Sequence, residues 1–551
     1  MSRSGTRTRT HTRAAAWALA VLLVGSSPVA LACTSIVVSR GASRDGSAMI
    51  TYSADAPFMP RLLYVPGGTH TAGELIQVKG WEDDRPCGPI RQVARTYSVV
   101  GLMNEHQLSL GETTTGGRRE LVDRSGILDY DALMFLTLQR ARTAREAIKI
   151  IDELAREYGY KSSGETFSIA DPNEAWIMEL IGKGPGQKGI VWVAARVPDG
   201  MITAHANLSR ITTFPLDDPK NWRYSPDVIS FAIEKRFYST NSQKPFSYRD
   251  AYHPDIAASQ KRACAGRVWS IYRRSASSQS FSDAFFRGNQ GAEDYPLFIK
   301  PDKPLGVGDV MALMRDHYEG TPYDMTRGVD AGPFGSPYRF RELTFKVDGH
   351  NYMWERPIST QQAGFVVVTQ SRKGTPDAVG GVTWFTPDDA SVSCFTPLYC
   401  GITALPAPYT RGDYRKFDWE SAWWVSNLVS NLCYDRWSRV APDVQAAAAK
   451  REGDLLKMQP VIEEAAAKLG AKDEGLMREF LTNYSVSTGE SVFRNWQGVA
   501  ESILVKHVDG YVKTDQGRAR GVGYSPDWLR RVIADRPEQF KLPTKEGETD
   551  H

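Results

Sequence analysis

Strand-like segments recur through the first 400 residues of this 551-residue chain, and helix-like segments follow in the remainder. Residues 33–39 (CTSIVVS), 166–170, 176–181 and 190–197 are short runs rich in β-branched residues, as strands usually are. Beyond about residue 404, apolar side chains recur at helical spacing, and no internal repeat is evident. Strands followed by helices are typical of the α+β class rather than of alternating βαβ units.

Local patterns give further structural expectations. Residues 33–52 predict a hairpin, with a turn between two strands. Helical spacing predicts one helix over residues 131–158, capped by Asp131, and Pro460 is expected to begin another helix near the C-terminus. Residues 184–189 (GPGQKG) have the spacing G-x-G-x-x-G, but they lead into a further strand, so we expect a hairpin loop and no dinucleotide site.

The N-terminus has the pattern of a secretory signal peptide. A basic start precedes an apolar run over residues 14–24, and Ala30-Leu31-Ala32 forms an A-x-A cleavage site. We therefore predict a signal peptide over residues 1–32 and an exported protein, periplasmic or extracellular. A mitochondrial-type transit segment fits the Arg- and Ser-rich start but explains the compact apolar run less well. No later segment is apolar for the ~20 residues that a membrane span needs.

Composition excludes two broad classes of function. Without residues 1–32 the chain has 63 basic and 64 acidic residues, a neutral balance that does not suit a general nucleic-acid binder. A mean hydropathy of −0.38 excludes a polytopic membrane protein. We predict a catalytic domain over residues 33–403, with an irregular insertion at about 245–340, and a helical region over 404–551 that packs on it.

Cysteine usage is consistent with export. The chain has six cysteines, and cleavage after Ala32 makes Cys33 the first residue of the mature chain. Five others remain, so one or two disulfides are expected and at least one of those thiols stays free or pairs unusually. Cys394 and Cys400 are spaced unsuitably for most zinc sites, and we expect no metal and no cofactor.

An N-terminal cysteine carries its own general base. The free α-amine has a pKa of ~7.7–8.0, so it can take the thiol proton and leave a thiolate that attacks a carbonyl. Two other interpretations of Cys33 are open. A lipoprotein anchor usually has a large aliphatic residue three places before the cysteine and a small one two places before, whereas Ala30 and Leu31 have the reverse order. The third interpretation is a structural cysteine.

Several blocks, taken in order, resemble the cysteine dipeptidases of the N-terminal nucleophile (Ntn) hydrolases, the dipeptidase A and secernin relatives. The resemblance spans roughly residues 33–509 and rests on residues 33–38 (CTSIVV), 42–47 (ASRDGS), 104–107 (NEHQ), 111–117 (GETTTGG), 171–176 (DPNEAW), 204–211 (AHANLSRI), 316–322 (DHYEGTP), 360–365 (TQQAGF) and 394–400 (CFTPLYC).

The resemblance implies a four-layer αββα sandwich and peptide hydrolysis through an acyl-enzyme on Cys33. It implies that Asp55 orients the α-amine and that Asn207 donates to the oxyanion. In the wider superfamily an arginine also follows the nucleophile on the second strand, but here that position holds Tyr52.

The same resemblance suggests substrate-binding residues. Thr114 falls near the second oxyanion position, and the segment from Glu112 through Thr113 to Thr115 lines the substrate pocket or binds the substrate's free amine. Arg356 is a candidate ligand of the substrate carboxylate, with an ordinary ion pair as the alternative. The expected partner is a dipeptide or short peptide, and a homo-oligomer is left open.

Two rival functions remain at this stage. One keeps the mechanism but cleaves a non-peptide amide, as the penicillin V and bile-salt acylases do. The other is a non-catalytic, lipid-anchored binding protein in which Cys33 is modified, an interpretation kept open by Tyr52 in place of the expected arginine.

Overall fold

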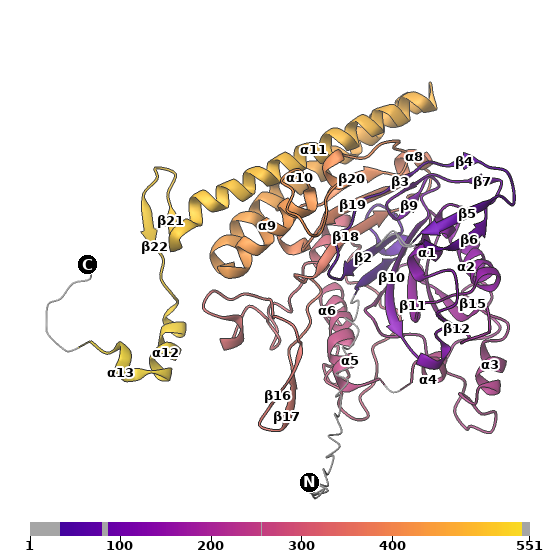
Figure 1. Ribbon diagram of the computed structural model, residues 1–551, viewed down its shortest axis with the longest axis horizontal. Helices are drawn as coiled ribbons and strands as arrows, with labels where there is room; N and C mark the ends of the chain where they lie inside the picture. The colour runs from indigo at the N-terminus through magenta and orange to yellow at the C-terminus, as the bar shows by residue number, and fades with distance from the viewer. Residues whose placement is uncertain (1–32, 80–85, 255, 543–551) are drawn as a thin grey trace, which may run out of the picture. The chain divides into compact units, whose positions relative to one another are not determined.

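Two antiparallel β-sheets organise the computed structural model, which describes residues 33–79, 86–254 and 256–542 (Figure 1). The first sheet has six strands in the order β14 (Ile202–His205), β1 (Ser35–Val38), β2 (Met49–Asp55), β18 (Ala363–Gln370), β19 (Val382–Pro387) and β20 (Thr396–Tyr399). The second has eight, in the order β15 (Trp222–Tyr224), β13 (Ile190–Arg196), β12 (Ala175–Gly182), β11 (Gly164–Ala170), β10 (Ser109–Gly116), β9 (Met103–Asn104), β8 (Val99–Val100) and β3 (Tyr64–Val65).

The N-terminal hairpin forms as the sequence predicts. Strand β1 pairs antiparallel with β2 in a register that sets Val37 opposite Ile50, and every residue of both strands is buried. The expected loop at residues 184–189 joins the antiparallel strands β12 and β13, so it is a hairpin connection. Both predictions concern neighbouring segments and are confirmed.

The two sheets contact each other through β1 and β2 on one side and β10, β11 and β12 on the other. Gly111 of β10 allows a close approach at this contact, because a Cβ there would lie 3.0 Å from Cβ of Tyr52. The core between the sheets is almost solvent-free, since Ile36, Tyr52 and Phe167 are each at most 1% exposed. This tight contact is where the residues around Cys33 meet.

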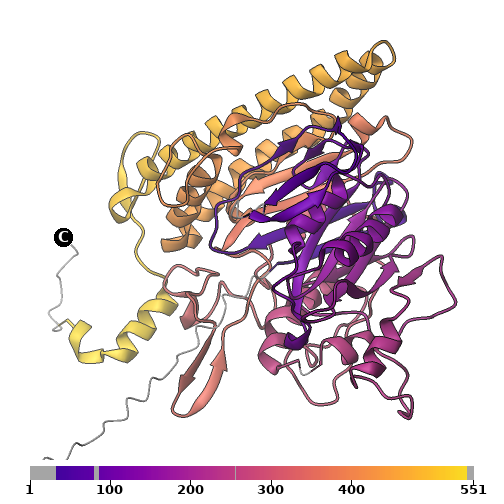
Figure 2. The same cartoon turned by 45° about the vertical axis from the view of Figure 1, so that its right-hand side comes forward.

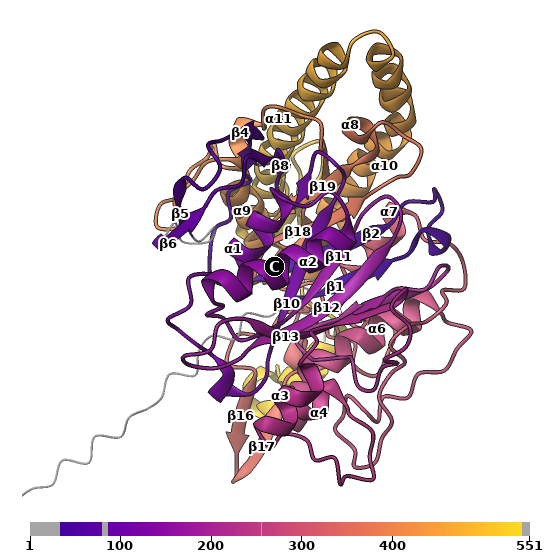
Figure 3. The same cartoon turned by 90° about the vertical axis from the view of Figure 1, so that its right-hand side faces the viewer.

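Helices cover the outer sides of both sheets (Figures 2 and 3). Helices α1 (Tyr130–Leu138) and α2 (Ala144–Tyr158) pack on β10–β13. Helices α9 (Ala422–Asp435), α10 (Trp437–Gly470) and α11 (Glu474–His507) pack on β19 and β20. Helices α6 (Gly266–Ser275) and α7 (Val307–Leu313) contact β14 and β18 of the six-stranded sheet.

The remaining elements are short. They are helices α3 (Val228–Glu234), α4 (Tyr248–Tyr252), α5 (Ala258–Gln260), α8 (Asp377–Gly380), α12 (Pro526–Asp535) and α13 (Pro537–Phe540), and the paired strands β4 (Gly68–Thr69) with β7 (Arg95–Thr96), β5 (Leu75–Lys79) with β6 (Pro86–Arg91), β16 (Thr344–Val347) with β17 (His350–Met353), and β21 (Tyr511–Lys513) with β22 (Ala519–Gly521).

Three sequence expectations need correction here. The helix expected over residues 131–158 is two helices, because Asp129 caps α1 by accepting from Ala132 N and Thr143 caps α2 by accepting from Glu146 N. Pro460 does not begin a helix but lies inside α10, where its side chain faces solvent and packing along α9 and α11 offsets the lost hydrogen bond. All six cysteines of the described residues are free thiols, so the expected disulfides are absent there.

In the described part of the chain, no helix combines the length and apolar character that a membrane crossing requires. The predicted signal peptide, residues 1–32, lies outside the described residues. The proposed boundary between residues 403 and 404 stays a prediction.

Candidate active site

Cys33 lies two residues before β1 and is buried, with 2% of its surface exposed. Its main-chain nitrogen donates a hydrogen bond to Oδ1 of Asn207 over 2.9 Å. Its Sγ lies 3.5 Å from Oε1 of Glu112, which accepts from the thiol. Both the nitrogen and the sulfur of one residue therefore contact side chains that the sequence singled out.

The register between β1 and β14 brings Asn207 to Cys33. Ser35 lies opposite His205, and continuing this antiparallel register two residues further sets residue 207 opposite residue 33. The backbone of Asn207 is left-handed, with φ of 59°, a conformation that asparagine tolerates better than most residues. Its Nδ2 donates to the carbonyl oxygen of Thr114 over 2.8 Å. Asn207 thus links the nucleophile to β10.

Strand β10 can form hydrogen bonds with the residues around Cys33 along one of its edges. Among the described residues, β9 pairs with that edge only where Ser109 lies opposite Met103. Beyond that point, the carbonyl oxygen of Glu112 accepts from Oγ of Ser35, and that of Thr114 accepts from Asn207. The strand edge therefore holds β1 and the segment after β14 by hydrogen bonds from side chains.

Tyr52 of β2 faces the same carboxylate as the thiol. Its hydroxyl donates to Oε1 of Glu112 over 2.6 Å, and its ring is 1% exposed. The position where the superfamily has an arginine therefore supplies a neutral hydrogen-bond donor to Glu112 instead of a cation.

The surroundings of the thiol disfavour its ionisation. Burial raises the pKa of Cys33 well above its usual value, and the negative charges of Glu112 and Asp55 raise it further. A hydrogen bond from the backbone N–H of Asp55 opposes these effects. A thiolate at this position needs compensation from a cation or from a change on substrate binding.

Asp55 and Arg356 form a buried ion pair. Nη2 of Arg356 lies 2.6 Å from Oδ2 of Asp55, and the two side chains are 3% and 0% exposed. Burial raises the pKa of Asp55, while the charge of Arg356 opposes that rise. The other oxygen, Oδ1, has no hydrogen-bond partner within the described residues. Because Arg356 contacts a carboxylate of the protein, its assignment to a substrate carboxylate stays a prediction.

The two threonines differ in their contacts. Oγ1 of Thr113 lies 2.7 Å from Nδ1 of His205, whose Nε2 lies 2.7 Å from Oγ of Ser168. The hydroxyl of Thr114 is buried and has no hydrogen-bond partner in the described part of the chain. Thr114 therefore joins the group around Cys33, whereas the Thr113 side chain belongs to a polar contact between the sheets.

Comparison with known proteins identifies the family. The model of peptidase family C69 matches residues 78–450, more than half of the chain. The chain belongs to peptidase family C69. The matched residues include Glu112, Asn207 and Arg356, whereas Cys33 precedes them. The resemblance to cysteine dipeptidases of this type is thereby confirmed, and the protein is a cysteine peptidase.

Three curated relatives of this C69 peptidase come from bacteria. A probable dipeptidase of Latilactobacillus sakei is 23% identical over 83% of this chain and 92% of its own length. A probable dipeptidase of Salmonella dublin is 26% identical over 70% of this chain and 84% of its own. Dipeptidase A of Lactobacillus helveticus is 24% identical over 73% of this chain and 81% of its own.

The structure also brings Arg267 to the site of this C69 peptidase, which the sequence did not predict. Arg267 belongs to α6 and is fully buried. Its Nη1 donates to the carbonyl oxygen of Cys33 over 2.6 Å, and its Nη2 donates to Oδ1 of Asn207 over 3.0 Å. The sequence does indicate that Arg267 is buried, because it falls at helical spacing between the apolar residues Ala263 and Ile271.

Glu165 is the second residue that the sequence did not predict. It lies opposite Thr114 on β11, so its side chain leaves the sheet on the same face as those of Thr114 and Glu112. It is 1% exposed, and its charge contributes to the raised pKa of Cys33. Two carboxylates on neighbouring strands thus lie near the thiol of this peptidase.

No group of three or more His, Cys, Asp or Glu residues within the described ranges could hold a metal ion.

Proposed function

We propose that this C69 peptidase is an exported cysteine dipeptidase that uses Cys33 as its nucleophile, with residue 33 at the N-terminus of the mature chain. The observation that carries this proposal is the double contact of Cys33, whose nitrogen bonds Asn207 while its sulfur lies beside Glu112. Relatives that are named dipeptidases support the substrate class. The order helices, sheet, sheet, helices agrees with the four-layer sandwich of the Ntn hydrolases, to which we assign the fold.

In the proposed mechanism, the α-amine of Cys33 accepts the thiol proton and Sγ attacks the scissile carbonyl carbon. The carbonyl π electrons move to oxygen, and the second N–H of the Asn207 amide, with a nearby backbone N–H, stabilises this oxyanion. The C–N bond then breaks as the α-ammonium protonates the leaving amine. Water attacks the resulting thioester, and the thiol is regenerated with release of the acid.

The charge of the site favours a substrate with a free amine. Three carboxylates, Asp55, Glu112 and Glu165, lie near the thiol, and two guanidinium groups, Arg267 and Arg356, lie near Asp55. When all five are ionised, one negative charge is in excess, and an ammonium on the substrate balances it. We assign Glu112 as the acceptor of that ammonium. A dipeptide has this group beside its scissile carbonyl, whereas the N-acyl amides of the rival acylases lack it.

Two measurements test the nucleophile. The mass of the N-terminal peptide of the exported protein is expected to show an unmodified Cys33 as residue one. Cys33→Ala is expected to abolish dipeptide hydrolysis, and full activity in that variant would refute the mechanism. A diacylglyceryl group on the sulfur of Cys33 would block the nucleophile, and another first residue would remove the catalytic amine. Either result would favour a binding role.

A substrate panel tests the substrate class. Dipeptides with a free amine are expected to be hydrolysed faster than the same dipeptides after N-acetylation and faster than N-acyl amides of the penicillin V type. Preference for the N-acylated compounds would favour the acylase.

A further inference from the structure

Arg356, the residue that the sequence suggests for a substrate carboxylate, is already occupied within the protein. Its Nη2 lies 2.6 Å from Oδ2 of Asp55, and its Nη1 donates to the carbonyl oxygen of Pro357 over 2.9 Å. Arg267 is fully buried as well. A substrate carboxylate beside Cys33 is therefore better bound by another cation, one that solvent and substrate can reach.

Arg341, in the loop before β16, is an exposed cation. A guanidinium has five N–H donors. Within the described residues, only Nη2 of Arg341 has an acceptor, which is Oε1 of Gln362 at 3.4 Å. This acceptor is a neutral amide, so no ion pair in the described part of the chain balances the positive charge of Arg341. The remaining donors are available to a ligand.

The register between β2 and β18 relates this contact to the nucleophile. Gln362 directly precedes Ala363, which lies opposite Asp55 in the antiparallel ladder. The backbone N–H of Asp55 in turn bonds Cys33. Because neighbouring strands are only about 4.8 Å apart, the contact between Arg341 and Gln362 lies about one strand away from the residue that bonds the nucleophile.

The charges around Arg341 agree with this position. Desolvation and the positive charge of Arg356 lower the pKa of Arg341, whereas the negative charge of Asp55 opposes that fall. The guanidinium therefore lies close enough to the buried ion pair to interact with both of its members, although residue 341 as a whole is exposed. With Arg341 included, the site has three carboxylates and three guanidinium groups, a neutral set that matches the one ammonium and one carboxylate of a dipeptide.

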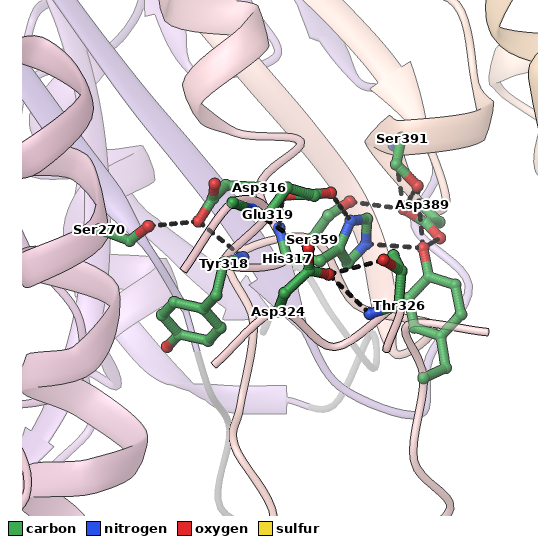
Figure 4. A network of polar contacts seen from close by, with 12 residues as sticks. Ser270, Asp316, His317, Tyr318, Glu319, Asp324, Thr326, Ser359, Asp389 and Ser391 are labelled. Carbon is green, nitrogen blue, oxygen red and sulfur yellow. Dashed lines mark hydrogen bonds and ion pairs between the residues drawn. The ribbon is translucent and has the colours of Figure 1, made fainter. Parts of the chain in front are cut away.

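A buried polar network holds the two segments that carry Arg341 and Gln362 (Figure 4). The carboxylate of Asp389 accepts from the hydroxyls of Tyr338 and Ser359. Tyr338 lies three residues before Arg341. In the same way, Ser359 lies three residues before Gln362. Because one buried carboxylate anchors both segments, the place of Arg341 beside Gln362 is set by the core even though Arg341 itself is exposed.

We propose that Arg341 binds the C-terminal carboxylate of the substrate and thereby selects dipeptides for hydrolysis. Glu112 then binds the ammonium at the other end of the same substrate. In a dipeptide, only the amide nitrogen and one Cα separate the scissile carbonyl carbon from the carboxylate carbon, whereas each further residue moves the carboxylate away by about 3.5 Å. The inference rests on the proposed function, in which Cys33 attacks that carbonyl.

Two matched substrates test this assignment. The best dipeptide and the same dipeptide with a C-terminal amide differ only in the carboxylate. The wild-type enzyme is expected to have a kcat/KM about 10-fold or more higher for the acid than for the amide, as the loss of a charged hydrogen-bond partner implies. Arg341→Gln is expected to lose this preference, because its kcat/KM falls for the acid and stays within about twofold of the wild-type value for the amide.

Lys346→Gln is the matched control. Lys346 is an exposed cation on β16, the strand that follows Arg341, and its side chain has no hydrogen bond to Gln362 in the described part of the chain. This variant loses the same charge and is expected to keep the wild-type preference for the acid. An equal loss of preference in Lys346→Gln would overturn the proposal, because the loss would then follow from net charge and not from a contact.

Equal kcat/KM of the wild-type enzyme for the acid and the amide would also overturn the proposal, and that comparison needs no variant. A folded Arg341→Gln enzyme that keeps the wild-type preference would do the same. Cys33→Ala is assayed on the acid in parallel. Activity in Cys33→Ala refutes the proposed function, whereas inactive Cys33→Ala beside a wild type that hydrolyses acid and amide equally refutes only this inference.

Discussion

Glu112 has opposing effects on the nucleophile and on the substrate. Its carboxylate accepts from the thiol of Cys33 and the hydroxyl of Tyr52, and its negative charge raises the pKa of Cys33. In the proposed function the same carboxylate binds the substrate ammonium. Binding of that ammonium would neutralise the charge beside the sulfur, so the thiolate becomes accessible when a dipeptide is present.

Glu112→Gln is therefore expected to separate thiol reactivity from turnover. The thiol pKa falls because a negative charge is removed, so iodoacetamide alkylates Cys33 at a lower pH than in the wild type. Dipeptide hydrolysis is expected to fall by about 10-fold or more, since the loss of a charged hydrogen-bond partner costs ~1.5–3 kcal/mol. Mass spectrometry of the Cys33 peptide measures the alkylation.

Glu120→Gln serves as the control, because Glu120 is an exposed glutamate just beyond the same strand. An alkylation midpoint that rises in Glu112→Gln, or dipeptide turnover that is unchanged, would contradict the roles assigned to Glu112.

At the scale of elements, a polar contact joins the two sheets. His205 of β14 lies between the hydroxyls of Thr113 on β10 and Ser168 on β11, in a region without solvent exposure. Burial lowers the pKa of His205 to about 3. The imidazole is therefore neutral in the folded enzyme, while the unfolded chain protonates it near pH ~6.5.

This difference predicts acid sensitivity. Between pH 6.5 and about 3 the unfolded state binds more protons than the folded state at His205, so the free energy of unfolding decreases as the pH falls. The contribution is about 2 kcal/mol between pH 6.5 and 5. Urea unfolding at pH 7.5 and 5 measures it. His205→Gln is expected to reduce the pH dependence, and His350→Gln, at an exposed histidine, to leave it unchanged. Equal pH dependence in His205→Gln and the wild type would contradict the prediction.

Contacts between neighbouring segments were predictable from the sequence, and contacts between distant ones were not. The hairpin of β1 and β2 and the connection between β12 and β13 follow from local strand patterns and turns. Cys33 followed from its position after a cleavage site. Arg267 lies 234 residues from Cys33, and its helical spacing with Ala263 and Ile271 indicates a buried position but no partner, so only the packing of α6 reveals its contact. The split between α1 and α2 depends on caps that the apolar spacing does not reveal.

At the scale of the whole molecule, the last helices contribute little to the core. Neither α12 nor α13 contains a buried residue, whereas α11 buries residues along its length, among them Leu481 and Trp496. Stability near the C-terminus therefore resides in α11, which packs on β20.

A chain that stops before Ser525 is expected to have a free energy of unfolding within about 0.5 kcal/mol of that of the full-length enzyme and to keep its kcat, because no side chain described between residues 525 and 542 is buried. Urea unfolding and dipeptide assays measure both. A chain that stops before Glu474, which lacks α11 as well, is expected to be insoluble. Loss of activity on removal of residues 525–551 alone would show that this segment has a role beyond stability.

The residues around Cys33 come from widely separated parts of the chain. Asn207 is 174 residues from Cys33, and Arg356 is 301 residues from Asp55. A ribosome must therefore synthesise about two thirds of the polypeptide before these groups can meet, and a nascent or prematurely terminated chain that lacks Arg356 cannot assemble them. In the proposed function, a chain that ends before Arg356 is therefore expected to be inactive even when its N-terminus is correctly cleaved at Cys33.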